Sequence, residues 1–496
     1  MNFDFDGWLA RRWFRIAIWS MVAVLSALKF FYLTADFPNW SPWLIDQAKY
    51  TDEGWWGSAA VTHFLIGHWY VAGDYNPAVA LPVWPAFLCA VFHFTGVSVV
   101  AARALNVGIS IATLGVVFAL VRRYTSMKAE TPALIAVLLL SASPFAFVFN
   151  RLAILDTLVV FEFCLLLLVA SFASARRIWP LIALAVLIAL TILTKTTAAL
   201  LAPAVFWVAW SAIGRRLKGL VPAILAVAVL PAALVKGYAA FAAALGYGAD
   251  YKYFFGVNAM PDIEWRQTFA TLLILLQNGF WIDRVLFPFG LLILVLTVAW
   301  KRKLWNNPLF AASWIALFAQ SVFIFSRQDD YAPRYFLVML PPLVWIVALT
   351  FGELTARTKK AAAVLLVAMT ASVVANIAMI DQFLTHRDYG FYHAALSVRE
   401  IVQSHPEQKR LILGVSGPQM SLMTGIPSIN DGFGTEDLAE KVARYQPGWY
   451  LAWNDVAQEN EDFLSAFRLE KMASYPVFDD DDRNTLILYK MVRRVE

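Results

Sequence analysis

The sequence has few cysteines and few charged residues, and each shortage excludes a class of protein. Cys89 and Cys164 are the two cysteines in 496 residues, and both lie in apolar sequence, so neither a disulfide framework nor a cysteine metal site is expected. Charged residues make up 15% of the chain and hydrophobic residues 60%, with a mean hydropathy of +0.62. This composition excludes an ordinary soluble domain and predicts a polytopic membrane protein.

The net charge of +5 would suit a nucleic-acid-binding protein if the basic residues formed one continuous surface. Instead they occur in small clusters between apolar runs, which is the distribution found in the cytoplasmic loops of membrane proteins. We therefore expect membrane lipids as partners and no nucleic acid.

Apolar runs of about 17 to 25 residues predict the membrane spans. Runs of this kind, about eleven in all, cover residues 16–35, 98–121, 131–149, 154–173, 178–194, 197–213, 219–243, 284–300, 308–326, 334–351 and 361–380. Basic clusters follow every second run, so the N-terminus is expected in the cytoplasm and the C-terminus outside. The predicted fold class is a polytopic α-helical membrane protein with about eleven transmembrane helices.

Two apolar stretches in the first outer loop are interpreted as helices that lie on the membrane surface. Ser58 to Ala72 is amphipathic and aromatic, and prolines interrupt the chain after it. Counting Leu81 to Gly96 as a span would move every later basic cluster to the wrong side of the membrane. Neither stretch is therefore included among the spans.

The composition changes after Ile380, where long apolar runs stop. Residues 410–415, 448–453 and 485–492 are predicted as strands and residues 436–445 as a helix. The sequence thus predicts a transmembrane domain over residues 1–380 and a small extracytoplasmic α/β domain over residues 381–496.

Single charged residues in the outer connections are the candidates for chemistry, because charge at a membrane boundary is costly. A carboxylate can take a proton from an acceptor, and cations can stabilise a phosphate leaving group. Any one of these residues alone could equally be a helix-end anchor whose charged group reaches the membrane surface. In chain order they are Asp52, Glu53, Arg151, Asp156, Lys195 and Arg334.

Other polar residues receive weaker assignments. Asp52 and Glu53 are expected in an extended or turn segment, where adjacent side chains point to different sides. His63 and His68 would be about 140° apart on a helix, so they do not form a metal pair. No cofactor is expected, although the two adjacent acids leave a divalent metal open. Lys29 is expected to reach outward along its helix, and Glu162 to lie at cytoplasmic depth or in helix packing.

Several short motifs together resemble a known family. They are Thr51-Asp52-Glu53-Gly54, Asn76-Pro77 with Leu81-Pro82-x-Trp84, Ala101 to Leu105 around Arg103, Arg151-Leu-Ala-Ile-Leu-Asp156, Leu193-Thr194-Lys195, and Pro333-Arg334-Tyr335-Phe336-Leu337. These motifs resemble those of the GT-C glycosyltransferases, in the branch of the protein O-mannosyltransferases and the lipid A aminoarabinose transferase. The resemblance covers roughly residues 1–380. Many relatives carry Lys-Pro-Pro in the first loop, where this chain has Ala80-Leu81-Pro82.

The resemblance implies a hexosyl or pentosyl transferase of the inner (plasma) membrane. The sugar would come from a polyprenyl-phosphate donor and pass to an envelope glycan, lipid or protein acceptor on the extracytoplasmic face. Asp52 would be the general base, Glu53 would hold the loop, and Asp156 would orient the acceptor or share a cation. The implied contacts to the donor phosphate are Arg103, Arg151, Lys195 and Arg334.

Two other functions remain open from the sequence. A transporter or flippase of lipid-linked sugars would have a similar size, but such proteins typically show internal repeats and ionisable residues at the membrane midplane. A non-catalytic scaffold for envelope assembly would leave the pair of Asp52 and Asp156 unexplained. Glycosyl transfer by the purified protein would distinguish the three.

Overall fold

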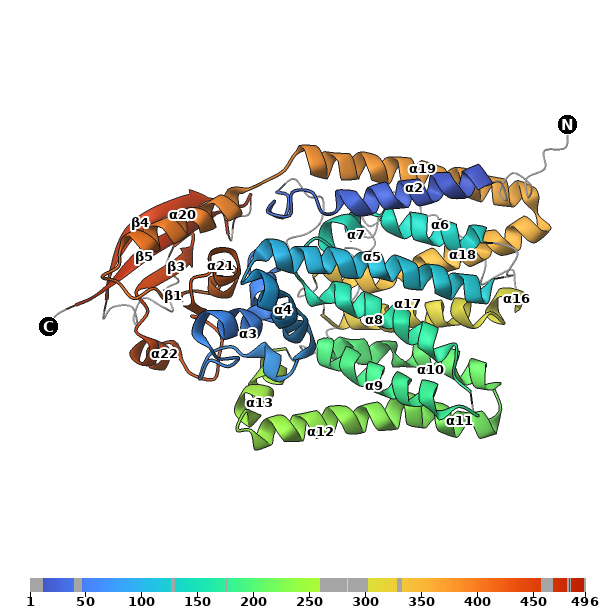
Figure 1. The fold of residues 1–496 in the computed structure, drawn as a ribbon, viewed down its shortest axis with the longest axis horizontal. Coiled ribbons are helices and arrows are strands. Elements are labelled where there is room, and N and C mark those ends of the chain that lie inside the picture. Colours follow the sequence, from blue (N-terminus) through green and yellow to red (C-terminus); the bar gives the residue numbers. More distant parts are fainter. Residues whose placement is uncertain are drawn as a thin grey trace.

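The computed structural model describes most of the chain. The described residues are 12–39, 47–125, 130–174, 176–258, 283, 302–327, 332–455, 467–479, 481 and 483–494. A helical bundle forms the larger part of the molecule, and a small sheet domain covers one end of it (Figure 1). This end is called the sheet-domain end below.

The bundle is built from long apolar helices that share one hydrophobic core. Its first half contains α2 (Arg12–Leu28), α5 (Val99–Tyr124), α6 (Thr131–Ser141), α7 (Pro144–Phe149), α8 (Leu155–Ala170), α9 (Ile178–Thr194), η3 (Thr196–Leu201) and α10 (Ala202–Ile213). Its second half contains α11 (Leu217–Ile224), η4 (Leu225–Val229), α12 (Leu230–Ala244), α13 (Gly248–Val257), α16 (Arg302–Trp305), α17 (Pro308–Arg327), η6 (Pro333–Met339), α18 (Leu340–Arg357) and α19 (Lys359–Thr385).

The predicted spans fall on helices wherever the structure describes them, although α2 ends at Leu28, before the end of the span predicted over residues 16–35. Among the described residues, six helical stretches are long and apolar enough to cross a membrane: α5, η3 with α10, α11 to α12, α17, η6 with α18, and the stretch that begins with α19. The predicted span 131–149 is divided, because Pro144 starts α7 and the Ser143 side chain caps it by accepting from the Ala146 N–H. The span 284–300 lies outside the described residues, so the total of eleven stays a prediction.

Two helices of the first loop, α3 (Asp52–Ile66) and α4 (Val83–Thr95), pack against each other. Their lengths of 15 and 13 residues correspond to about 20 Å, less than the ~30 Å of a hydrocarbon core. The helix predicted over residues 58–72 starts earlier, at Asp52, and ends before Gly67, whose φ of 82° allows the chain to turn. The extended or turn segment expected at Asp52 and Glu53 is therefore wrong, because both residues lie in the first helical turn.

The sheet domain contains five strands in the order β2-β1-β3-β5-β4. These are β1 (Ile412–Leu413), β2 (Ser428–Ile429), β3 (Trp449–Trp453), β4 (Phe467–Pro476) and β5 (Thr485–Arg493), with helices α20 (Gly390–Ser404), α21 (Gly417–Thr424) and α22 (Leu438–Tyr445). β1 pairs in parallel with β2 and β3, whereas β5 pairs antiparallel with β3 and β4. The strands β1, β3 and β5 and the helix α22 were predicted, whereas β2 and β4 were not.

The first loop also joins the bundle to the sheet domain. The carboxylate of Asp74 lies 3.2 Å from Lys441 Nζ and accepts a hydrogen bond from the Asn430 N–H at 3.1 Å. Val71, from the same loop, packs into the second hydrophobic cluster of the sheet. Trp55 of α3 also reaches the sheet domain, where its Nε1 donates to the Val415 carbonyl at 2.9 Å. The loop is therefore held between both parts of the molecule.

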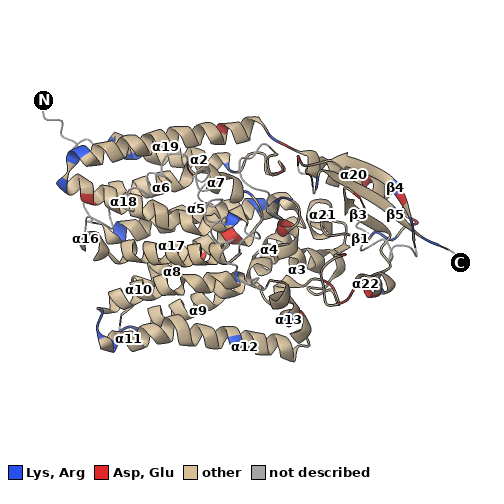
Figure 2. Cartoon of the chain, turned by 180° about the vertical axis from the view of Figure 1, so that it is seen from behind, with Lys and Arg blue, Asp and Glu red and all other residues tan. Residues whose placement is uncertain are grey.

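Within the helical bundle, charged residues gather mainly in two places (Figure 2). Basic segments lie at the end of the bundle remote from the sheet domain, around α11 and the start of α19, while a mixed acidic and basic group lies where α4 and α5 approach α21. The outward orientation expected for Lys29 is wrong, because its side chain is buried and donates to Ser110 Oγ at 3.5 Å. Glu162 lies in the packing of α8 against α9, where it accepts a hydrogen bond from Thr194.

Candidate active site

Four charged side chains from distant parts of the sequence form a continuous row of alternating charge. Arg334 Nη2 lies 2.6 Å from Asp52 Oδ2, and Arg334 Nε lies 3.8 Å from Asp156 Oδ2. The other oxygen of Asp156 accepts a hydrogen bond from Lys195 Nζ at 2.5 Å. The row therefore runs acid, base, acid, base, and it is called the charge row below.

Each member of the charge row comes from the end of a helix. Asp52 begins α3, Asp156 lies in the first turn of α8, and Arg334 is in η6 just after Pro333. Lys195 is in extended conformation between α9 and η3. Carboxylates are favoured in the first turn of a helix because the backbone N–H groups there have no intrahelical partner. Helix ends thus present both acids to the two cations.

Most of the charge row is withdrawn from solvent. The side chains of Asp52 and Asp156 are each 1% exposed and that of Arg334 5%, whereas Lys195 is 16% exposed. Buried charges are tolerated only when they are paired, and the alternating order satisfies this condition. Lys195 also lies 4.5 Å from the centre of the Tyr335 ring. A ligand would therefore meet Lys195 first and Arg334 behind it.

Glu53 belongs to a second, separate ion pair. Its two oxygens accept hydrogen bonds from Arg103 Nε at 2.8 Å and Arg103 Nη2 at 2.6 Å, which is the two-pronged geometry that a guanidinium forms with a carboxylate. The backbone N–H of Ala153 and the side chain of Gln419 also donate to it, at 2.7 and 3.0 Å. With four hydrogen bonds and a fully buried side chain, Glu53 fastens α3 to its neighbours.

Gly54 allows the sheet domain to approach this second pair closely. A Cβ at this position would lie 2.2 Å from the backbone nitrogen of Gln419, so the helices α3 and α21 can be this close only at a glycine. The Gly54 N–H donates to Gln419 Oε1 at 2.7 Å. Gln419 thus binds Gly54 and Glu53 with the two ends of one amide group.

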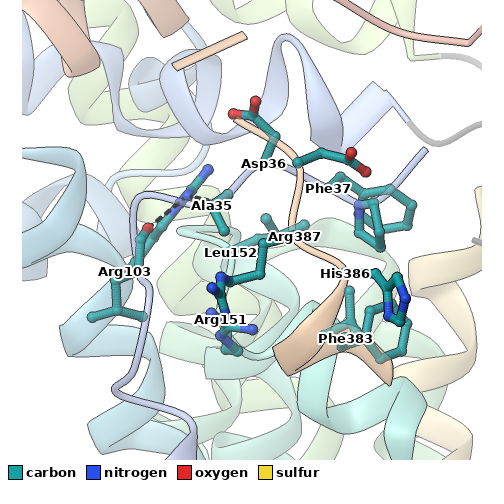
Figure 3. Close-up of a pocket in the computed structure, with 13 residues that line it drawn as sticks. Ala35, Asp36, Phe37, Arg103, Arg151, Leu152, Phe383, His386 and Arg387 are labelled. Atoms are coloured by element: carbon teal, nitrogen blue, oxygen red, sulfur yellow. Dashed lines mark hydrogen bonds between the residues drawn. The ribbon is translucent and has the colours of Figure 1, made fainter. Parts of the chain in front are cut away.

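Arg103 and Arg151 lie apart from the charge row. Arg103 is occupied by Glu53 and by the carbonyls of Leu33 and Ala35, each at 2.7 Å. Arg151 donates to the carbonyls of Phe31 and Tyr32 at 2.7 and 2.9 Å. Both line a different cavity near the ends of α2 and α19 (Figure 3). Of the four cations expected to contact the donor phosphate, the structure brings Lys195 and Arg334 to the acids.

Four positioning residues were missed from the sequence. Asn106 on α5 donates to the carbonyls of Leu152 and Ile154, the latter at 2.7 Å, and so holds the turn that leads to Asp156. Gln419 and the Asp74–Lys441 pair fix the first loop, as described above. A polar residue in a long apolar helix was the available signal for Asn106, but an amide such as Gln419 in the sheet domain has no comparable signal in the sequence.

No metal-binding group emerges from the part of the chain that the structure describes. Within those ranges, no three side chains of histidine, cysteine, aspartate or glutamate come together in a way that could hold a metal ion. The carboxylates of Asp52 and Asp156 face cationic side chains instead.

The sequence and the structure are both similar to known glycosyltransferases. Residues 77–238 match the family model described as dolichyl-phosphate-mannose-protein mannosyltransferase. No curated protein matches the chain at a significant level.

Among solved structures, ArnT from Cupriavidus metallidurans in the apo state is 16% identical, with a TM-score of 0.60 over 94% of this chain and 97% of that chain. The same protein bound to undecaprenyl phosphate has a TM-score of 0.57 at 14% identity, over 94% of this chain and 97% of that chain. The Archaeoglobus fulgidus oligosaccharyltransferase has a TM-score of 0.52 at 13% identity, over 87% of this chain and 67% of that chain.

The likeness to ArnT extends over the bundle and the sheet domain alike, since it covers nearly all of both chains. The resemblance indicated by the short sequence motifs is thereby confirmed at the level of the fold. The chain is a multi-span helical membrane protein with the GT-C glycosyltransferase fold and a small C-terminal sheet domain.

Proposed function

We propose that this protein transfers a sugar from a polyprenyl-phosphate donor to an acceptor hydroxyl or amine, with Asp52 as the general base. The observation that carries the proposal is the charge row, in which two carboxylates alternate with two cations at one place. Glycosyl transfer from a phosphate needs both kinds of group, since one must accept a proton and the other must hold the departing phosphate.

The proposed step uses these residues as follows. Lys195 and Arg334 hold the donor phosphate, which competes with Asp52 for the Arg334 guanidinium and leaves Asp52 next to the acceptor. The acceptor oxygen or nitrogen attacks the anomeric carbon while its proton passes to Asp52. The bond from the anomeric carbon to the phosphate oxygen breaks, and the polyprenyl phosphate leaves with that electron pair. Asp156, bonded to Lys195, keeps this cation in place and orients the acceptor.

The class of donor is supported by what the similar proteins bind. ArnT was solved with undecaprenyl phosphate, and the matching family is described by a dolichyl-phosphate-linked sugar. The Archaeoglobus fulgidus oligosaccharyltransferase was solved with a tethered acceptor peptide. A lipid-linked donor is therefore proposed here, with a hexose or pentose as the sugar and an envelope glycan, lipid or protein as the acceptor.

The orientation proposed is that of an inner (plasma) membrane protein with its N-terminus in the cytoplasm and its sheet domain outside. The basic segments at the opposite end of the bundle (Figure 2) support it, because basic residues collect on the cytoplasmic side. An alkaline phosphatase fused after Glu496 should be active, whereas a green fluorescent protein exported by the same route should stay dark. The reverse pair of results would place the charge row on the cytoplasmic face.

The test of the reaction is transfer by the purified protein from synthetic polyprenyl-phosphate sugars to an extract of envelope lipids, glycans and proteins. Mass spectrometry of the products would identify sugar and acceptor together. Asp52→Asn should abolish most of the product, whereas Asp381→Asn, an exposed carboxylate on α19, serves as the matched control. Movement of the donor across a vesicle membrane without any product would instead support the flippase.

A further inference from the structure

A second group of cations lines a cavity that the proposed reaction does not use. The cavity has about 30 Å³ of free space and lies between residues 33–38 after α2, the start of α5, the turn after α7 and the end of α19. Its lining includes Asp36, Arg103, Arg151, His386 and Arg387 (Figure 3). Arg103 lines the cavity and also bonds Glu53, the neighbour of Asp52 in α3, whereas no member of the charge row is in the lining.

Two guanidinium groups in this cavity have no carboxylate partner among the described residues. Arg151 donates only to the Phe31 and Tyr32 carbonyls, and Arg387 donates to the Leu384 carbonyl. The Nε atoms of Arg151 and Arg387 are both buried and make no hydrogen bond within the described part of the chain. Figure 3 shows both side chains directed into the same space. Buried donors without an acceptor are costly, so the cavity is suited to an added acceptor.

The acids nearby are engaged elsewhere. Asp36 accepts hydrogen bonds from the backbone N–H groups of Phe391 and Tyr392 at the start of α20, and its carboxylate points away from both guanidinium groups (Figure 3). Asp388 accepts from the Asn39 N–H at 2.7 Å. Burial, together with the positive charges of Arg103 and Arg387, lowers the pKa of Arg151 to about 10. The local potential at Arg151 is therefore positive, which favours an anion.

The surroundings of the cavity are those of a lipid-facing surface. The helices α2 and α19, whose ends border the cavity, expose large apolar side chains along their length, including Ile16, Val24, Val367 and Val374. Beside the cavity, Phe31 and Tyr32 are half exposed, and Arg387 lies 3.7 Å from the centre of the Tyr32 ring. An acyl chain could lie along these helices, with its polar group at the arginines. The free space equals roughly two water-sized groups, which two phosphate oxygens could occupy.

We propose that Arg151 and Arg387 bind the phosphate of an anionic membrane lipid at the sheet-domain end of the bundle. The planar guanidinium forms two parallel hydrogen bonds with phosphate oxygens, and both groups have donors that face the cavity. Arg387 lies in the link between α19 and α20, and Arg151 holds the chain after α2. A lipid bound to both would therefore fasten the sheet domain's link to the bundle.

The test is native mass spectrometry of the full-length protein released from detergent micelles that contain either phosphatidylglycerol or phosphatidylcholine. The wild type should retain one phosphatidylglycerol molecule from the first micelles and no corresponding phosphatidylcholine molecule from the second. Arg387→Gln and Arg151→Gln should each lower that retention by about tenfold or more, as expected for the loss of one charge-assisted hydrogen bond. The phosphatidylglycerol retention of Arg387→Lys should lie between those of the wild type and Arg387→Gln, because lysine keeps the charge and loses the planar guanidinium. Arg176→Gln, an exposed arginine elsewhere, should match the wild type.

Arg151 also supports the chain after α2, so its variant could lower lipid retention through misfolding. Arg387 donates to a carbonyl of its own helix end, so Arg387→Gln is the milder change, and a matching elution volume in size-exclusion chromatography would show that it folds. Equal retention of both lipids by the wild type would overturn the proposal, as would unchanged phosphatidylglycerol retention in Arg387→Gln. If inorganic phosphate displaced the lipid from the wild type at low millimolar concentration, the site would be one for free phosphate and the lipid assignment would be wrong.

Discussion

Asp52 and Glu53 are adjacent at the start of α3, yet their carboxylates are bound by different arginines. Asp52 lies 2.6 Å from Arg334 in the charge row, whereas Glu53 is bonded to Arg103 on the opposite side. Neighbouring positions in a helix are about 100° apart around its axis, so the two acids cannot share a partner easily. One carboxylate therefore faces the proposed substrate site, and the other holds the protein together.

The first prediction separates these two acids by activity and stability. Asp52→Asn removes a base without changing size, and turnover should fall by about 10²- to 10⁴-fold while the melting temperature stays near normal. Glu53→Gln leaves Arg103 charged and unpaired in the interior, which typically costs about 3 to 5 kcal/mol. Transfer assays and thermal unfolding in detergent would measure both effects.

The control for this experiment is a double substitution. Adding Arg103→Gln to Glu53→Gln removes the unpaired charge and should recover part of the lost stability. Normal turnover in Asp52→Asn together with an inactive but stable Glu53→Gln would reverse the two roles.

The second prediction concerns Arg334. Arg334→Ala should lower kcat/KM for the lipid-linked donor by about 10²- to 10³-fold, since it removes the cation placed to stabilise the departing phosphate. Arg334→Lys should recover only part of the lost kcat/KM, because an ammonium cannot reach Asp52 and Asp156 with two separate nitrogen atoms as the guanidinium does. Steady-state kinetics over a range of donor concentrations would measure it. Wild-type kinetics in Arg334→Ala would shift the phosphate contact to Lys195.

The third prediction tests the close contact between α3 and α21. Gly54→Ala would place a methyl group 2.2 Å from the Gln419 backbone, so α21 must move away and the hydrogen bonds of Gln419 must lengthen. We expect faster proteolysis of the sheet domain and a lower melting temperature. Gly108→Ala is the matched control, because its Cβ would meet nothing within 4 Å and should leave both readouts nearly unchanged. Equal behaviour of the two variants would show that α3 does not need this contact.

The fourth prediction is a pH dependence that arises from Asp36. Burial raises the pKa of this carboxyl to about 7, although Arg103 and the amides of Phe391 and Tyr392 favour its charged form. The folded state therefore binds the proton more tightly than the unfolded state, and this contribution to stability is lost as the pH rises toward 7. Asp36→Asn should remove the dependence, so its stability relative to the wild type should rise by up to about 1.4 kcal/mol per pH unit between pH 4 and 7.

Thermal unfolding of both proteins across this pH range would measure the effect of Asp36→Asn. Two curves that run parallel from pH 4 to 8 would show that Asp36 is ionised in the folded protein throughout. If the wild type gained stability relative to Asp36→Asn as the pH rises, the pKa of Asp36 would be lowered by folding, and its charged form would stabilise the protein.

The sequence alone determined where the helices of the bundle lie and which charged residues deserve attention. Apolar runs must be helical in a membrane because every backbone polar group needs an internal partner, so their positions follow from length and composition. Charged residues at the ends of such runs are rare and costly, and that rule was sufficient to select Asp52, Asp156, Lys195 and Arg334. The motifs around them were sufficient to indicate the GT-C fold.

Only the tertiary structure decided which charges meet. Arg151 and Arg334 satisfy the same sequence rule, yet Arg334 joins Asp52 and Asp156 whereas Arg151 faces Arg387 in another cavity. The burial of Lys29 against Ser110 and the contact of Gln419 with Glu53 likewise depend on how helices and sheet domain pack. Pairing is set by distances of a few ångström between residues up to several hundred positions apart, and no local pattern of apolar and charged residues contains that information.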